Sequence, residues 1–163
     1  MKTRLVVPLV VLAISFALPS FAQQAKDLVG TWTMVSITLE KDGKKTDLFD
    51  PNPQGRLMRD ADGHVAYMVT RADLPKFASN NRAAGTPEEN KAVVQGSIFY
   101  FGSYSVNEAD KTITTHIEVC SFPNWIGAER KSTYTINGDE LDSTTSGSSV
   151  GEGTVHVVYK RAK

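Results

Sequence analysis

Cysteine and histidine are scarce in this chain of 163 residues. The one cysteine, Cys120, excludes an intramolecular disulfide, and we expect it to be buried and inert, with a reactive thiol as the alternative. His64, His116 and His156 lie far apart, and no cysteine–histidine cluster has the spacing of a zinc site. The sequence therefore predicts no metal site and no cofactor.

The chain also lacks an excess of charge of either sign. It has 18 lysines and arginines against 18 aspartates and glutamates. Removal of the first 22 residues would take away Lys2 and Arg4 and leave a net charge of −2. The basic residues form no stripe along the sequence, so nucleic acid is not an expected partner.

Long apolar runs are missing after the N-terminus, so no membrane span is expected there. The one marked run, from Leu5 to Leu18, is too short for a spanning helix, and two basic residues precede it. Ser20 and Ala22 are small residues spaced as in a signal-peptidase cleavage site. This layout predicts a secretory signal peptide at residues 1–22. It also predicts export of one domain, residues 23–163, to the periplasm or the medium.

The rest of the chain consists mostly of short alternating segments separated by turn signals such as Asp62-Gly63 and Asn137-Gly138. Strands are expected at 30–40, 56–60, 64–70, 98–106, 112–120, 129–136, 139–145 and 154–161. Regular short strands are typical of an all-β sandwich or barrel. Eight antiparallel strands can close into an up-and-down barrel that holds filler side chains or one small ligand.

Residues 71–97 interrupt this rhythm and contain the only expected helix. Thr86 is a good N-cap, Pro87 suits the first helical position, and Glu89 completes a capping box. The pattern predicts a helix at 87–95, ended by Gly96. Such a long connection is expected to be a lid for one barrel mouth or a plug without further function.

Two of the expected strands leave open which face points into the barrel. If Val106 pairs with Thr112, one face of 98–106 and 112–120 is aromatic and ionisable, and the other is apolar. The first face carries Tyr100, Tyr104, His116 and Glu118, whereas the second carries Phe99, Phe101, Ile113, Ile117 and Val119. Either the apolar face is the core, or the first face lines a ligand pocket and places His116 beside Glu118 for acid–base chemistry.

A set of short motifs runs through residues 28–161. They are Leu28-Val29-Gly30-Thr31-Trp32, Pro53-x-Gly55 with Asp62-Gly63, Arg71-Ala72-Asp73 with Phe77-Ala78, Gly85-Thr86-Pro87-Glu88-Glu89, Tyr100-Phe101-Gly102-x-Tyr104, His116-Ile117-Glu118 and Phe122-Pro123-Asn124-Trp125-Ile126-Gly127. Together these motifs resemble the lipocalin-like domain family of bacteria and fungi. The resemblance implies a lipocalin-type barrel. With the strands and helix expected above, the predicted fold is an eight-stranded antiparallel up-and-down lipocalin-like barrel with one short helix in a lid-like insertion.

The resemblance also bears on individual residues. It implies that His116 and Glu118 are important, because they fall on the family's His-x-Val-Glu pattern. Thr115 stands where many relatives carry a second histidine, and Ser132 stands where an arginine is usual. As in a lipocalin floor, Trp32 is expected to close one end of the barrel with Arg161 stacked on its ring.

The expected ligand-binding residues combine aromatic rings with polar groups. They are Tyr67, Arg71, Tyr100, Tyr104, His116, Glu118, Asn124, Trp125, Arg130 and Tyr134. The leading hypothesis is an exported carrier or sensor that binds a small, mostly apolar molecule in the barrel lumen. The alternative is an isomerase, cyclase or hydrolase with His116 as base, Glu118 as its orienter and Tyr100 or Tyr104 as a hydrogen-bond donor. A third hypothesis is an interaction domain whose apolar face is buried in a homodimer.

Overall fold

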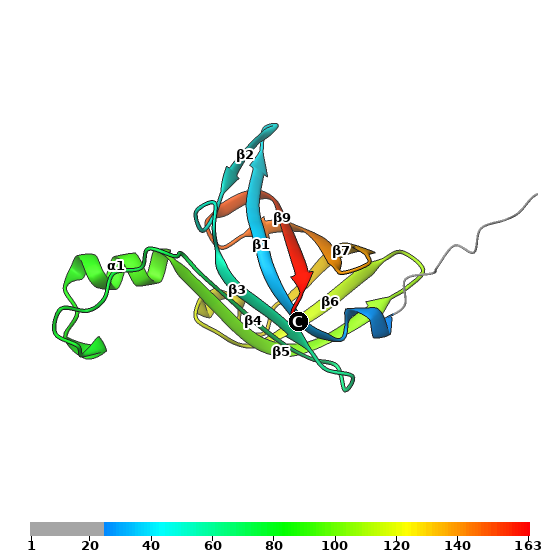
Figure 1. Cartoon of the computed structure of the whole chain (residues 1–163), viewed down its shortest axis with the longest axis horizontal. Helices are drawn as coiled ribbons and strands as arrows, with labels where there is room; N and C mark the ends of the chain where they lie inside the picture. The colour runs from blue at the N-terminus through cyan, green and yellow to red at the C-terminus, as the bar shows by residue number, and fades with distance from the viewer. Residues whose placement is uncertain (1–24) are drawn as a thin grey trace, which may run out of the picture.

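Eight antiparallel strands close into a barrel in the computed structural model, which describes residues 25–163 (Figure 1). The barrel strands are β1 (Gly30–Lys41), β3 (Gln54–Arg59), β4 (His64–Thr70), β5 (Ser97–Asn107), β6 (Thr112–Cys120), β7 (Glu129–Asn137), β8 (Glu140–Ser148) and β9 (Gly151–Arg161). Each pairs with the next, and β1 also pairs with β9. The predicted up-and-down barrel is confirmed. The predicted signal peptide, residues 1–22, lies outside the described residues.

One strand and three short helices were not predicted. Strand β2 (Lys44–Asp47) pairs only with the end of β1, after the Asp42-Gly43 turn. The short 3-10 helices are η1 (Ala25–Leu28), η2 (Arg82–Ala84) and η3 (Pro123–Trp125). Strand β2 (Lys-Lys-Thr-Asp) is exposed at every position and forms no part of the closed barrel, and it was missed because it has no apolar residues that could alternate.

One end of the barrel is closed by tightly packed side chains. Trp32 is completely buried, and its indole N–H donates a hydrogen bond to the carbonyl of Leu28 at 3.0 Å. The guanidinium carbon of Arg161 lies 4.2 Å from the centre of the Trp32 ring. Arg161 also donates hydrogen bonds to the carbonyls of Val29 and Asp27, at 3.2 and 2.8 Å. The predicted stacking of Arg161 on Trp32 is therefore present, and this end is called the floor.

The insertion between β4 and β5 extends away from the barrel, to the left in Figure 1. Its helix α1 (Pro87–Gln95) has the predicted bounds and the predicted capping box of Thr86 and Glu89. None of the residues of α1 is buried. The helix thus does not fill the mouth as a plug, which corrects that expectation, whereas the lid stays a prediction.

The pairing of β5 with β6 differs by one residue from the predicted pairing. Val106 lies opposite Ile113, because the turn begins after Asn107 and contains four residues. The side chain of Asn107 accepts a hydrogen bond from the backbone N–H of Ala109, and Lys111 has a positive φ of 54°, which together shape this tighter turn. A shift of one residue moves every side chain of a strand to the opposite face.

His116 and Glu118 are therefore exposed on the outside of the barrel, so their predicted place in the lumen is wrong. The side chains of β6 that point inward are instead those of Ile113, Thr115 and Ile117. Of the two faces left open for β5, the one that carries Tyr100 and Tyr104 points inward, and both tyrosines are partly buried. The side chains that β5 and β6 leave outside include Phe99, Phe101 and Val119, which are about half exposed.

Candidate functional site

A cavity of about 90 Å³ occupies the part of the lumen that the core does not fill. All eight barrel strands contribute to its wall, as does the segment that follows β2. Its lining comprises Ile37, Leu48, Phe49, Leu57, Arg59, Tyr67, Ile98, Tyr100, Thr115, Trp125, Arg130, Ser132, Ser143, Thr145, Ser148, Ser149, Val155, Val157 and Tyr159. This arrangement is a partly open pocket with mixed apolar and polar walls, the usual form of a small-molecule site.

Aromatic rings form one side of the cavity. Tyr67 and Tyr100 stack with ring centres 4.8 Å apart and an angle of 15° between their planes. They come from opposed positions on β4 and β5, where cross-strand neighbours on one face approach closely. Burial raises the pKa of both phenols, and also that of Tyr159. All three are therefore neutral hydrogen-bonding groups near neutral pH.

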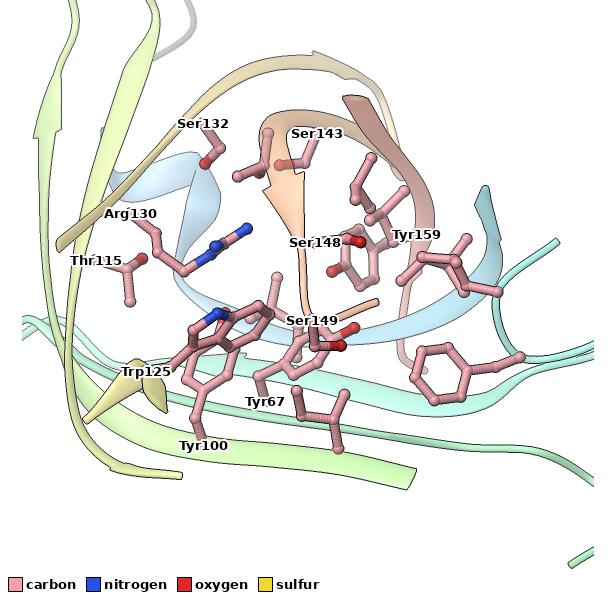
Figure 2. Close-up of a pocket in the computed structure, with 18 of the residues that line it drawn as sticks. Tyr67, Tyr100, Thr115, Trp125, Arg130, Ser132, Ser143, Ser148, Ser149 and Tyr159 are labelled. Carbon is pink, nitrogen blue, oxygen red and sulfur yellow. The ribbon is translucent and has the colours of Figure 1, made fainter. Parts of the chain in front are cut away.

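Hydroxyl groups gather on the other side of the cavity. Ser132 of β7 and Ser143 of β8 lie across the lumen from Tyr67 and Tyr100, as Figure 2 shows. Thr115 and Thr145 add two further hydroxyls to the lining. These short side chains leave room between the two walls and can donate or accept hydrogen bonds.

Arg130 and Trp125 stand at the end opposite the floor, which is called the mouth. The Arg130 guanidinium lies 4.1 Å from the centre of the Trp125 ring and donates a hydrogen bond to the carbonyl of Gly147 at 2.8 Å. This contact links the start of β7 to the end of β8. Figure 2 shows Arg130 directed toward the space between the two walls. Burial lowers the pKa of Arg130, but arginine keeps its charge at neutral pH.

A second cavity of about 440 Å³ adjoins the lumen outside the mouth. The two cavities share four lining residues, Leu48, Phe49, Ile98 and Ser149. The C-terminal residues of α1, Val93–Gln95, border the outer cavity. The exposed helix thus meets the barrel beside the mouth, which gives the insertion a place next to the entrance of the lumen.

Four of the predicted ligand-binding residues line the lumen, namely Tyr67, Tyr100, Trp125 and Arg130. The others lie elsewhere. Tyr104 donates a hydrogen bond to the carbonyl of Asp60 at 2.8 Å, and Tyr134 is buried outside the cavity lining. Asn124 is exposed in η3, and Arg71 forms ion pairs with Asp50 and Asp73 at the base of the insertion.

The acid–base group considered for an enzyme is not assembled. His116 and Glu118 project from the outer surface, whereas the Tyr104 hydroxyl is directed to the floor end of the barrel. Cys120 is buried, as expected, and its sulfur accepts a hydrogen bond from the backbone N–H of Phe122. Within residues 25–163, no group of three or more metal-ligating side chains comes together.

The sequence did not identify Arg59 as a lumen residue. It is 8% exposed and lies at the floor end of β3, with its guanidinium carbon 5.4 Å from the centre of the Tyr104 ring. The signal was the alternation of β3, in which Gly55, Leu57 and Arg59 are buried while Arg56 and Met58 are exposed. The predicted strand, 56–60, contains both Leu57 and Arg59, but a charged residue at the end of a strand is usually exposed, so Arg59 was not placed in the lumen.

Comparison with known proteins gives three findings. The family model for a lipocalin-like domain matches residues 29–160. A protein of Aspergillus oryzae, named 4'-hydroxy-3'-methoxypropiophenone carrier protein ppsC, is 28% identical over 87 residues, which cover 50% of this chain and 78% of the fungal protein. A solved structure of a variant of the fluorescent protein UnaG aligns with a TM-score of 0.39 and 12% identity, over 86% of this chain and 99% of that one.

The described part of the chain also bears on membrane insertion. None of the helices formed by residues 25–163 has both the length and the apolar character that a membrane span requires.

Proposed function

The chain belongs to the lipocalin-like domain family, and from this we propose that it carries or senses a small, mostly apolar molecule in the barrel lumen. The observation that supports this most is the cavity itself, which every barrel strand lines. Its stacked tyrosines can contact an apolar body, and its serine and threonine hydroxyls can orient a few polar atoms.

The dimensions of the site limit the ligand. The lumen cavity, about 90 Å³, is smaller than an engineered apolar cavity of about 150 Å³ that holds benzene. A ligand with a single ring would therefore fill the lumen and extend past Arg130 into the outer cavity of about 440 Å³. The two cavities together fall within the range of about 300–1,000 Å³ that is usual for small-molecule sites. The fungal relative, named as a carrier of a substituted propiophenone, supports a ligand of this kind.

Native mass spectrometry can test the proposed lumen binding. Purified protein is incubated with a mixed lipid and metabolite extract, and retained molecules are identified by their mass. Ser132→Phe should abolish retention, because the added ring occupies the lumen. Thr133→Phe is the matched control, since the neighbouring Thr133 is exposed on the outer face of the same strand. Retention of nothing by the wild type, or equal retention by both variants, would argue against the proposal.

We also propose that the protein acts after export. The support is the basic, apolar and small-residue pattern of residues 1–22. N-terminal sequencing of material recovered from the periplasm or medium should then begin at Gln23. An intact Met1 on exported protein would contradict this part of the proposal.

A further inference from the structure

Arg59 is a buried cation without a partner for two of its nitrogens. Among the described residues, neither its Nε nor its Nη1 has a hydrogen-bonding partner. The side chain is 8% exposed and contributes to the wall of the lumen cavity. Unsatisfied hydrogen-bond donors are uncommon in protein interiors, and burial of an unpaired charge is strongly unfavourable. The arginine is therefore unlike an ordinary core residue.

No acidic side chain of the cavity lining offsets this charge. The cavity lining, taken from residues 25–163, contains two arginines and neither aspartate nor glutamate. Desolvation lowers the pKa of Arg59, and the groups that act on it electrostatically are Tyr100, Tyr159, Tyr104 and Tyr134. Burial raises the pKa of each of these phenols, so none supplies a phenolate at neutral pH. The floor end of the lumen thus carries an uncompensated positive charge.

The two lumen arginines differ in their state of pairing. Arg130, at the mouth, stacks on Trp125 and donates to the carbonyl of Gly147. Arg59, at the floor end, lies near the Tyr104 ring, which supplies no hydrogen-bond acceptor to its free N–H groups. A negatively charged ligand would therefore gain more from Arg59 than from Arg130, because the hydrogen bonds of Arg59 are still to be made.

We propose that the lumen takes a small organic monoanion, specifically a carboxylate with an apolar or aromatic body, and that Arg59 binds the carboxylate. This inference rests on the proposed lumen binding and adds the chemical class of the ligand. The carboxylate lies deep at the floor end, and the body contacts the stacked Tyr67 and Tyr100. A single carboxylate matches the single unpaired cation, and its planar shape suits hydrogen bonding to guanidinium. The small lumen favours it over a bulkier, dianionic phosphate.

The test compares matched carboxylates and primary amides, which have nearly the same shape and differ in charge. The pairs are benzoate with benzamide, cinnamate with cinnamamide and hexanoate with hexanamide. Affinity is measured by calorimetry on the wild type. At least one carboxylate should bind about tenfold or more tightly than its amide, since a charge-assisted hydrogen bond is lost in the amide. Arg59→Met should reduce this ratio to about one and leave the affinity for the amide in place.

Arg56→Met is the control variant. Arg56 is exposed on the outer face of the same strand, so its replacement should keep the preference for carboxylate. Arg59→Lys should keep part of that preference, because it retains the charge. Thermal unfolding without ligand gives a second readout. Arg59→Met should raise the Tm, by about 3 °C or more, because an unpaired buried charge is removed.

The outcomes separate the inference from the function on which it rests. If amides and carboxylates bind the wild type equally well, lumen binding stands and the role of Arg59 is overturned. The role is also overturned if Arg59→Met keeps the preference for carboxylate. A lowered Tm for Arg59→Met would identify Arg59 as a structural residue and count against it as a ligand site. If no member of either series binds, and native mass spectrometry also finds no retained molecule, both proposals fail.

Discussion

Trp32 and Arg161 connect the two ends of the chain at the floor of the barrel. They lie opposite each other in the pairing of β1 with β9, the pairing that closes the barrel. The indole buries a large apolar surface, and the guanidinium covers its face while donating to two carbonyls from the segment before β1. Each residue therefore supports the position of the other.

This contact predicts coupled losses of stability. Trp32→Ala should lower the free energy of unfolding by about 3–5 kcal/mol, as for other large-to-small aromatic substitutions. Arg161→Ala should lower it by about 1–3 kcal/mol, through the lost stacking and hydrogen bonds. Denaturant unfolding of both variants and the double variant measures the coupling. Fully additive losses would show that the two side chains do not interact. Lys160→Ala, at an exposed neighbour, should change stability by less than about 0.5 kcal/mol.

His64, unlike His116, meets a carboxylate. Its Nδ1 lies 2.8 Å from Oδ2 of Asp60, in the turn between β3 and β4. Oδ1 of Asp60 also accepts a hydrogen bond from the backbone N–H of His64 at 2.8 Å. The side-chain hydrogen bond to Asp60 raises the pKa of His64, whereas the backbone hydrogen bond from His64 lowers the pKa of Asp60.

The raised pKa of His64 predicts how its contribution to folding stability depends on pH. Because the pKa of His64 is raised by folding, its stabilising effect is complete below about pH 6.5 and is lost as the pH rises through the folded-state pKa. An NMR titration should place the His64 midpoint above 6.5, and Asp60→Asn should lower that midpoint. Asp62→Asn is the control and should lower it less, since Asp62 acts only through a weaker electrostatic effect. A midpoint that Asp60→Asn leaves unchanged would contradict the pairing.

At the scale of secondary-structure elements, the β5–β6 hairpin shows where the sequence was informative and where it was not. The bounds of β6 and α1 agree with the predicted ranges, because alternation and capping are local signals. The predicted register was wrong by one residue, because register depends on the number of residues in the turn.

A β-bulge is a second irregularity in this hairpin. Gly102 pairs with Ile117 and Phe101 with Val119, so Glu118 has no partner on β5.

The bulge predicts that Gly102 cannot be replaced without loss of stability. A Cβ at this position would collide with the backbone carbonyl oxygen of His116. Because the colliding atom belongs to the backbone and not to a flexible side chain, it cannot easily move away. Gly102→Ala should lower the free energy of unfolding by about 1–3 kcal/mol, as measured by denaturant unfolding. Ser105→Ala, at an exposed position of the same strand, serves as the control and should change it by less than about 0.5 kcal/mol. Equal stability of both variants would mean that the strands are not so close at Gly102.

At the scale of the whole molecule, the barrel was predictable and the polarity of its lumen was not. Turn signals and short alternating strands indicated eight strands, and their order around the barrel follows the chain. On β7 and β8, by contrast, Ser132 and Ser143 point inward while Thr133 and Thr144 point outward. Since both faces are polar at these four positions, hydrophobicity there could not reveal which face lines the cavity. Four of the predicted site residues nevertheless line it, and two of these, Tyr100 and Trp125, belong to the motifs found in residues 28–161.

The distribution of tyrosines offers the most direct test of lumen binding. The chain has five tyrosines. Tyr67, Tyr100 and Tyr159 line the cavity, whereas Tyr104 and Tyr134 lie outside its lining. Protein labelled with carbon-13 in the tyrosine rings is titrated with the tightest binder of the carboxylate and amide series, and the signals are assigned by Tyr→Phe variants. The lumen site predicts saturable shifts of the Tyr67, Tyr100 and Tyr159 signals, larger than those of Tyr104 and Tyr134. Saturable binding that leaves the three lumen tyrosines unchanged would contradict it.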